Sequence, residues 1–230
     1  MRPITWSLSI VLLVALTSLG SRIDAQGGPK KVEIGKNVFI EVDGEQRRVL
    51  VNAYVCLRQG QLEQLVTRKR TKEHEAILAV DADARHIHLA LVAAKAAPGS
   101  PVKFRPKFEV PSGTPVKITL EYKDKGKTVR VPAQQWIRNI KSKKDLDTDW
   151  VFAGSVLIPD PFQKGKEPYY AANDGDVICI SNFDTALLDV PFNSPKDNDD
   201  LAYEAHTERI PALDTPVLII LEPVLPKKKQ

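Results

Sequence analysis

The stretch NVFIEVDGEQRRVLVNAYVCL, residues 37–57, decides the fold class of this chain. Two runs rich in β-branched and other apolar residues flank Asp43-Gly44, a dipeptide that accepts the positive φ angles of a tight hairpin turn. Strands of this composition pair readily when such a turn joins them. The stretch therefore predicts a β-hairpin over residues 38–57.

Two more glycine-containing turns and a closing apolar run extend this pattern along the chain. The turn at residues 124–126 predicts a hairpin over residues 116–131, and the turn at residues 174–175 predicts a third over residues 168–181. The run PVLIILEP, residues 216–223, is typical of a buried strand bounded by prolines. These signals predict a largely antiparallel sheet system.

Helical signals are fewer than strand signals. Asp83 is placed to cap an alanine-rich helix over residues 84–96, which Pro98-Gly99 would stop. Residues 133–140 and 185–189 suggest one or two further short helices, whereas residues 201–208 fit either period. The expected fold class is α+β, mostly antiparallel β with one main helix at about 84–96 and one or two short helices.

The first 25 residues have the layout of a secretory signal peptide. Arg2 precedes an uncharged run at residues 8–19, and small residues suited to cleavage follow at Gly20 and Ala25. The run is too short to span the hydrocarbon core of a bilayer, so the chain is not expected to be membrane-spanning. We expect export, followed by cleavage after Gly20 or Ala25, and a periplasmic or secreted protein.

The remaining sequence is expected to form one domain. Residues 26–44 would supply a linker and the first strand, residues 45–224 the domain, and residues 225–230 a basic tail. Lys and Arg number 33 against 29 Asp and Glu, and most of these charges are interspersed. The runs 68–70 and 227–229 are interpreted as a solvated loop and a solvated tail. This pattern predicts no nucleic-acid partner, because such proteins concentrate basic residues on one face.

The two cysteines, Cys56 and Cys179, leave two alternatives open. Export would place them where a disulfide can form and persist. Each also lies in an apolar run, NAYVCL or DVICIS, which suits a buried free thiol. Two cysteines without a C-x-x-C pair are too few for an iron–sulfur cluster within this chain, and no cofactor is predicted.

Complete catalytic and metal-binding motifs are absent from the sequence. His74-Glu75 begins like the zinc-protease helix motif, but residue 78 is Leu where the second histidine must stand. No phosphate-binding loop occurs, and Ser155 has no G-x-S-x-G context. An imidazole–carboxylate site for metal binding or proton transfer would still form if folding brought His74, Glu75 and His88 together.

Seven stretches, taken together and in order, resemble the YdjY-type domain, a family of exported planctomycete-type proteins of unknown function. They are residues 62–82, 88–102, 136–140, 150–155, 169–183, 185–191 and 204–211. The resemblance carries no established activity, and it leaves His86 and His206 outside the pattern. Among the positions that it does match, those proposed to line a cleft are His74, Glu75, His88, Trp150, Ser155 and Asn182.

Two function hypotheses follow from these observations. The first is an exported soluble domain that serves as a binding or structural module of the cell envelope and has no catalysis of its own. The alternative is an uncharacterised enzyme or metal-binding site centred on His74 and Glu75. Whether the chain is an enzyme is left open by the sequence.

Overall fold

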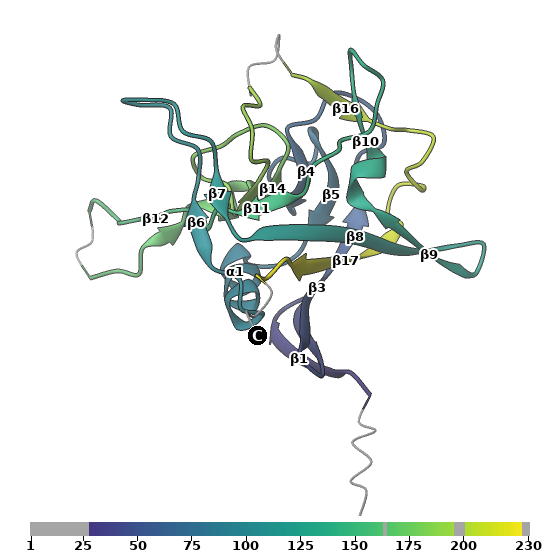
Figure 1. The fold of residues 1–230 in the computed structure, drawn as a ribbon, viewed down its shortest axis with the longest axis horizontal. Coiled ribbons are helices and arrows are strands. Elements are labelled where there is room, and N and C mark those ends of the chain that lie inside the picture. The colour runs from purple at the N-terminus through teal and green to yellow at the C-terminus, as the bar shows by residue number, and fades with distance from the viewer. Residues whose placement is uncertain (1–27, 163–164, 196–200, 227–230) are drawn as a thin grey trace, which may run out of the picture.

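A computed structural model describes residues 28–162, 165–195 and 201–226 of the chain (Figure 1). The expected signal peptide, residues 1–25, and the lysines at 227–229 lie outside the described residues. The chain is 43% strand and only 9% helical, and its centre is a closed barrel of eight strands. The expected α+β class is therefore wrong: the described residues form a β-protein with one α-helix.

The elements are numbered in chain order. The strands are β1 Lys30–Gly35, β2 Val38–Asp43, β3 Gln46–Val55, β4 Gln64–Arg68, β5 Ala76–Val80, β6 Pro98–Ser100, β7 Ser112–Gly113, β8 Pro115–Asp124, β9 Lys127–Pro132, β10 Ile137–Asn139, β11 Trp150–Phe152, β12 Leu157–Ile158, β13 Tyr169–Tyr170, β14 Ile178–Cys179, β15 Leu188–Asp189, β16 Tyr203–Ala205 and β17 Pro216–Pro223. The helices are α1 Ala84–Ala93 and the 3₁₀ turns η1 Ala133–Trp136 and η2 Ala171–Asp174.

The barrel follows the strand order β3-β17-β8-β11-β15-β14-β4-β5 and closes where β5 pairs with β3. Most neighbours are antiparallel, as predicted, but β4 with β5 and β14 with β15 are parallel. Every residue of β5 is buried, so the strand has no alternation of apolar and polar residues. Such a fully buried strand carries no period-two signal, so β5 was not predicted from the sequence.

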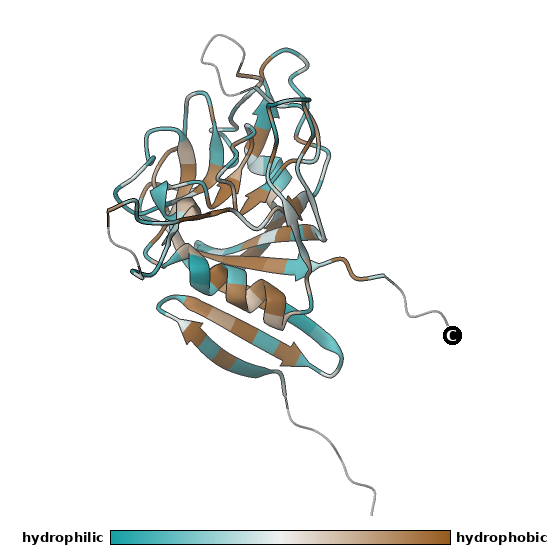
Figure 2. Ribbon diagram, turned by 90° about the vertical axis from the view of Figure 1, so that its left-hand side faces the viewer, coloured by the Kyte–Doolittle hydropathy of each residue, from teal (hydrophilic) through white to brown (hydrophobic). Residues whose placement is uncertain are grey.

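The β1–β2 hairpin continues the sheet beyond β3, outside the closed ring. Figure 2 shows α1 lying between this hairpin and the rest of the barrel. The helix buries one face, made by Ala84, Ile87, Ala90 and Leu91. No helix in the described ranges is long and apolar enough to cross a membrane.

Three strand predictions and the main helix are confirmed in outline. The hairpin over 38–57 is β2 with β3, the hairpin over 116–131 is β8 with β9, and residues 216–223 form β17. Helix α1 begins after its N-cap Asp83, whose carboxylate accepts the Arg85 N–H, as the cap signal predicts. It ends three residues early at Ala93, since the chain turns to a positive φ at Lys95.

The third predicted hairpin, over residues 168–181, is wrong. Strand β13 pairs with β12, whereas β14 pairs with β4 and β15, and the turn η2 separates the two. Gly175 takes φ 124° at the end of η2, where an added Cβ would come within 2.7 Å of Thr67 Oγ1. The glycine therefore serves a close packing contact, not a two-residue hairpin turn.

The short-helix predictions hold only in part. Residues 133–140 form the single turn η1 and then β10, which pairs with β16. Residues 185–189 form a turn followed by β15 and contain no helix. The ambiguous segment 201–208 contains the strand β16. In each case pairing with a neighbouring strand outweighs the local helical pattern.

Candidate functional site

A chain of hydrogen bonds joins α1 to the strands beside it through Tyr170. The Tyr170 hydroxyl donates to the Gly154 carbonyl at 2.8 Å and lies 2.9 Å from Nδ1 of His88. A phenol has one proton, so toward His88 its oxygen accepts, and Nδ1 of His88 must carry a hydrogen. Burial lowers the pKa of His88, although the Gly154 carbonyl opposes that shift. In the neutral ring Nε2 is then the unprotonated nitrogen.

The segment beside His88 has an unusual backbone. Gly154 and Ser155 both have positive φ angles, 92° and 56°. For serine this conformation is uncommon, and surrounding contacts must hold it. The Ser155 hydroxyl donates to the Thr185 carbonyl at 2.6 Å and accepts the Ala172 N–H at 3.0 Å. The hydroxyl of Ser155 therefore braces the bend.

The bend opens a hollow of about 460 Å³ against α1, which we call the α1 hollow. This volume lies within the range of small-molecule sites. Exposed Leu89 and Leu157 contribute apolar surface, and His88 contributes a polar group. The complete lining is Arg85, His88, Leu89, Gly154, Ser155, Val156, Leu157, Glu167 and Tyr170.

A second cluster of polar groups surrounds Glu75. Lys72 Nζ lies 3.0 Å from Asp176 Oδ1 and 3.9 Å from Glu75 Oε1. The side chains of Glu63 and Glu75 hydrogen-bond to each other, and burial together with the Glu75 charge raises the pKa of Glu63 to about 7. His74 is 77% exposed, with Nε2 3.6 Å from Glu75 Oε2.

The structure distributes the predicted cleft residues over these two clusters. His88 and Ser155 belong to the α1 hollow, whereas His74 and Glu75 belong to the second cluster, and no contact among the described residues joins the two histidines. Thr185 connects the two clusters, because its carbonyl accepts a hydrogen bond from Ser155 and its hydroxyl donates one to Asp176. In the described part of the chain, no group of three or more His, Cys, Asp or Glu side chains is placed to hold a metal ion.

Trp150 and Asn182 are structural members of the same region. The Trp150 Nε1–H donates to the Cys179 carbonyl at 2.8 Å, and the ring is fully buried. Asn182 Nδ2 donates to Asp189 Oδ1 at 3.1 Å, and Asn182 Oδ1 accepts the Ser194 N–H at 2.8 Å. Both side chains thus hold strands and loops together and line no pocket described above.

Both cysteines are free thiols in the structure, so the disulfide considered from the sequence is not formed. Cys56 Sγ donates to the Ala76 carbonyl at 3.1 Å, and Cys179 is fully buried in β14. Burial raises the pKa of Cys56 to about 12 and that of Cys179 well above its usual value. The apolar runs that contain them therefore supply two poorly ionised thiols, one half-buried and one in the core.

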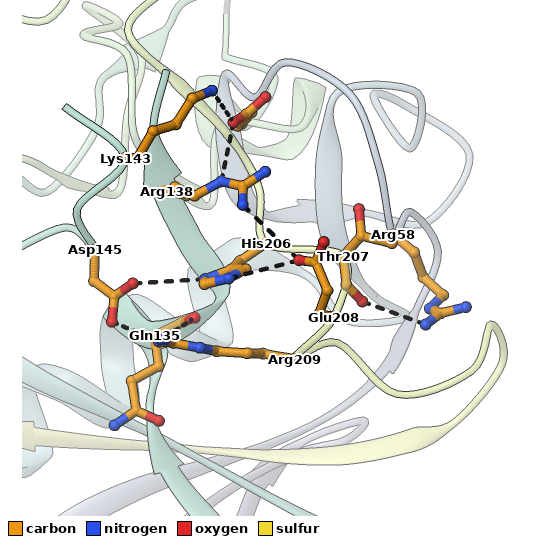
Figure 3. Close-up of polar contacts among 10 residues, drawn as sticks. Arg58, Gln135, Arg138, Lys143, Asp145, His206, Thr207, Glu208 and Arg209 are labelled. Carbon is orange, nitrogen blue, oxygen red and sulfur yellow. Dashed lines mark hydrogen bonds and ion pairs between the residues drawn. The ribbon is translucent and has the colours of Figure 1, made fainter. Parts of the chain in front are cut away.

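His206, which the sequence analysis set aside, lies between two carboxylates (Figure 3). Its Nδ1 is 3.5 Å from Asp145 Oδ1 and its Nε2 is 3.6 Å from Glu208 Oε2. Arg138, in β10, lies 3.0 Å from Glu204 in the paired strand β16. The network fastens β16 and the following turn to β10, and it borders no described pocket.

A family model for the YdjY domain matches residues 40–222. The chain belongs to the YdjY domain family. No curated protein and no solved structure matches the chain. The α1 hollow and the polar cluster around Glu75 both lie inside the residues that the YdjY model matches.

Several residues of the site were not found from the sequence. Tyr170, Glu63, Lys72 and Asp176 carry the contacts described above, and none was singled out as a candidate. Tyr170 stands in the stretch YYAANDGDVICISNF, one of those that carry the family resemblance. Glu63 and Lys72 resemble ordinary surface charges until folding brings them to Glu75.

Proposed function

We propose that this YdjY domain is an exported binding module of the cell envelope, and that the α1 hollow holds its ligand. The observation that supports this most directly is the fixed protonation of His88. His88 lines the hollow, its Nδ1 is engaged by the Tyr170 hydroxyl, and burial lowers its pKa, so in the neutral ring Nε2 is the nitrogen able to accept a hydrogen bond. A few oriented polar groups in a largely apolar wall are typical of a small-molecule site.

The charged residues at the rim narrow the class of ligand. Arg85 donates to the carboxylates of both Asp83 and Glu167, so the charges at the rim pair with one another. The exposed apolar side chains of Leu89 and Leu157 favour a ligand with an apolar body. The expected ligand is therefore uncharged, with an apolar body and one hydroxyl or N–H donor for His88.

A pair of probes tests this proposal. 4-Propylphenol has an apolar body and a donor, whereas its methyl ether keeps the body and loses the donor. We expect the phenol to bind about fivefold more tightly, since one hydrogen bond contributes about 1 kcal/mol. The difference should vanish in His88→Phe. Titration followed by amide NMR shifts of residues 85–89 and 154–157 measures both affinities.

A matched pair of leucines controls for non-specific binding to apolar surface. Leu89 and Leu213 are both 56% exposed, but only Leu89 lines the α1 hollow. Leu89→Ala should weaken binding of both probes several-fold, and Leu213→Ala should leave it unchanged. Equal effects of the two substitutions, or no preference for the phenol, would refute the proposed site.

The export part of the proposal rests on residues 1–25 and has its own test. Expression in a bacterium with a secretion system should yield a mature protein that begins at residue 21 or residue 26 and fractionates outside the cytoplasm. N-terminal sequencing identifies the cleavage site. An intact first residue in all fractions would contradict export.

A second candidate is proton-transfer chemistry at Glu75, and one observation favours it. Glu63, with its pKa raised to about 7, shares a hydrogen bond with Glu75 beside Lys72. A carboxyl group that titrates near neutral pH can act as an acid or a base. Carbon-13 NMR titration of the carboxyl groups tests this: a Glu63 midpoint near 4.5 would remove the chemical basis for the candidate.

A further inference from the structure

The basic run Arg68-Lys69-Arg70 is not merely a solvated loop, because it lines a hollow of about 350 Å³ at the end of β4. The other lining residues are Lys36, which follows β1, and Asp81, which follows β5. We call these five residues the cationic hollow. None of them lines the α1 hollow, so the inference below stands apart from the function proposed above.

The backbone that presents the three basic residues is held in place. Thr71 Oγ1 donates to the Arg68 carbonyl at 2.5 Å, and the Arg70 N–H donates to Glu73 Oε1 at 2.6 Å. Arg70 itself has a φ of 66°, a conformation that this tight turn requires. A ligand that binds here therefore meets a turn that is already ordered, and the entropic cost of binding is reduced.

The carboxylates near the cationic hollow are already engaged. Asp81 accepts from Lys36 Nζ at 2.7 Å, and Glu73 caps the Arg70 N–H. The pKa of Asp81 is lowered by the hydrogen bond from Lys36 and further by the charges of Lys69 and Arg68. The charges of Lys69 and Arg68 are therefore close enough to Asp81 to favour its ionised form.

The cationic hollow keeps an excess of positive charge, because its four basic residues face a single carboxylate, that of Asp81. Within the described ranges, none of Arg68, Lys69 and Arg70 has an acidic partner within ion-pair distance. Lys69 Nζ lies 5.9 Å from the centre of the Tyr54 ring, which leaves its charge available. Three like charges held together repel one another, since the Asp81 carboxylate is already paired with Lys36, and a bound anion would relieve that repulsion.

We propose that the cationic hollow binds a phosphate group. Arg68 and Arg70 each present a planar fork of donors that matches two oxygens of a phosphate, and Lys69 adds a point charge. The source of the group is either a soluble phosphate ester or the headgroup of an anionic lipid. Both sources present the same chemistry to the cationic hollow, and the experiment separates them.

Titration of the full chain with inorganic phosphate, followed by calorimetry and amide NMR shifts, tests the proposal. We expect shifts centred on residues 68–70 and weaker binding as salt is added, because exposed charges are screened. Arg68→Gln with Arg70→Gln should weaken binding at least tenfold. Arg47→Gln with Arg130→Gln removes the same charge from β3 and β9 and should change the affinity less than twofold.

Urea unfolding checks that the double variant is folded. If it is not, Arg70→Gln alone serves instead, since Arg70 lies on the exposed turn, and it should weaken phosphate binding about threefold. Equal weakening by the test pair and the matched pair, or shifts that avoid residues 68–70, would overturn the proposal. Such a result would mean that phosphate responds to net charge alone.

Vesicle flotation identifies the source of the phosphate group. Retention on phosphatidylglycerol but not phosphatidylcholine vesicles, competed by inorganic phosphate, supports a lipid headgroup. Phosphate binding without vesicle retention supports a soluble ester. Vesicle retention that neither inorganic phosphate nor the double variant reduces would overturn the phosphate site, because the membrane would then be recognised elsewhere on the protein.

Discussion

The Tyr170 hydroxyl lies 2.9 Å from Nδ1 of His88, and this contact ties β13 to α1. Because the same hydroxyl donates to the Gly154 carbonyl, it also fixes which His88 nitrogen carries the hydrogen. Tyr170 is therefore a positioning residue for the α1 hollow. Its role is to hold a neutral imidazole in one tautomer beside apolar surface.

Tyr170→Phe is expected to cost stability and binding selectivity together. The substitution removes the hydrogen bonds of a buried hydroxyl and leaves the Gly154 carbonyl without that donor, so the free energy of unfolding should fall by about 1–3 kcal/mol. The freed His88 ring should then lose its preference for 4-propylphenol over the ether. Urea unfolding and the two probe titrations measure these effects.

The neighbouring tyrosine provides the control for that substitution. Tyr169 is exposed, and its hydroxyl donates to Asp174 at 2.6 Å. Tyr169→Phe should change the free energy of unfolding by less than about 1 kcal/mol and leave probe selectivity intact, since a surface hydrogen bond contributes little. If Tyr169→Phe abolished the selectivity as well, the selectivity would not depend on the His88 tautomer that Tyr170 fixes.

The pair Glu63–Glu75 predicts that stability depends on pH in a definite direction. The folded pKa of Glu63 is about 7, above its ordinary value of 4.5, so the folded state binds more protons than the unfolded state between these values. The contribution of Glu63 to the free energy of unfolding is therefore complete below about pH 4.5. It declines by about 1–3 kcal/mol as the pH rises to about 7. Urea unfolding at steps from pH 4.5 to 8 measures the decline.

Two substitutions isolate the contribution of Glu63 to that pH profile. Glu63→Gln cannot ionise and should flatten the decline, whereas Glu33→Gln on the exposed strand β1 should preserve it. Asp189, whose pKa burial raises to about 8, adds a decline of the same sign in every variant. A Glu63→Gln profile identical to that of the wild type would show that Glu63 ionises normally.

The parts of the fold that could be predicted are those with local signals. Residues 38–57 carry alternating β-branched residues around an Asp-Gly turn, and residues 84–93 carry a capping aspartate and alanines. These features act over a few residues and are visible in one sequence. The parallel strand β5 and the very short strands β14 and β15 depend on partners distant in the chain. The residues around these strands in the sequence do not identify the strands with which they pair.

The candidate site shows the same division. His88 and Ser155 were identified, and they lie together in the α1 hollow. Glu63 and Asp176 come together only when the barrel closes. The residues next to them in the sequence therefore gave no indication that they belong to a site. The run Arg68-Lys69-Arg70 was visible from the start, but the turn that orders it depends on the side chains of Thr71 and Glu73.

Asn182 should be among the most sensitive positions of the chain. Asn182→Ala removes donors to Asp189 and the Val190 carbonyl and an acceptor for the Ser194 N–H, all in a buried setting. We expect the free energy of unfolding to fall by about 2–4 kcal/mol, because buried polar groups lose their partners. Asn52→Ala, at an exposed position of β3, should change it by about 0.5 kcal/mol or less. Comparable losses in the two variants would contradict this role.

The two thiols give a prediction that separates the structure from the disulfide considered at the outset. Protein recovered from an oxidising compartment and denatured without reductant should show two titratable thiols, since Cys56 and Cys179 are both free. In the native state Cys56→Ser, which retains only Cys179, should react with a thiol reagent at a rate limited by opening of the core. Full burial and a raised pKa both suppress its thiolate. Absence of thiols in the denatured protein would instead demonstrate the bridge, and it would require β14 to move, because Cys56 Sγ is held 3.1 Å from the Ala76 carbonyl.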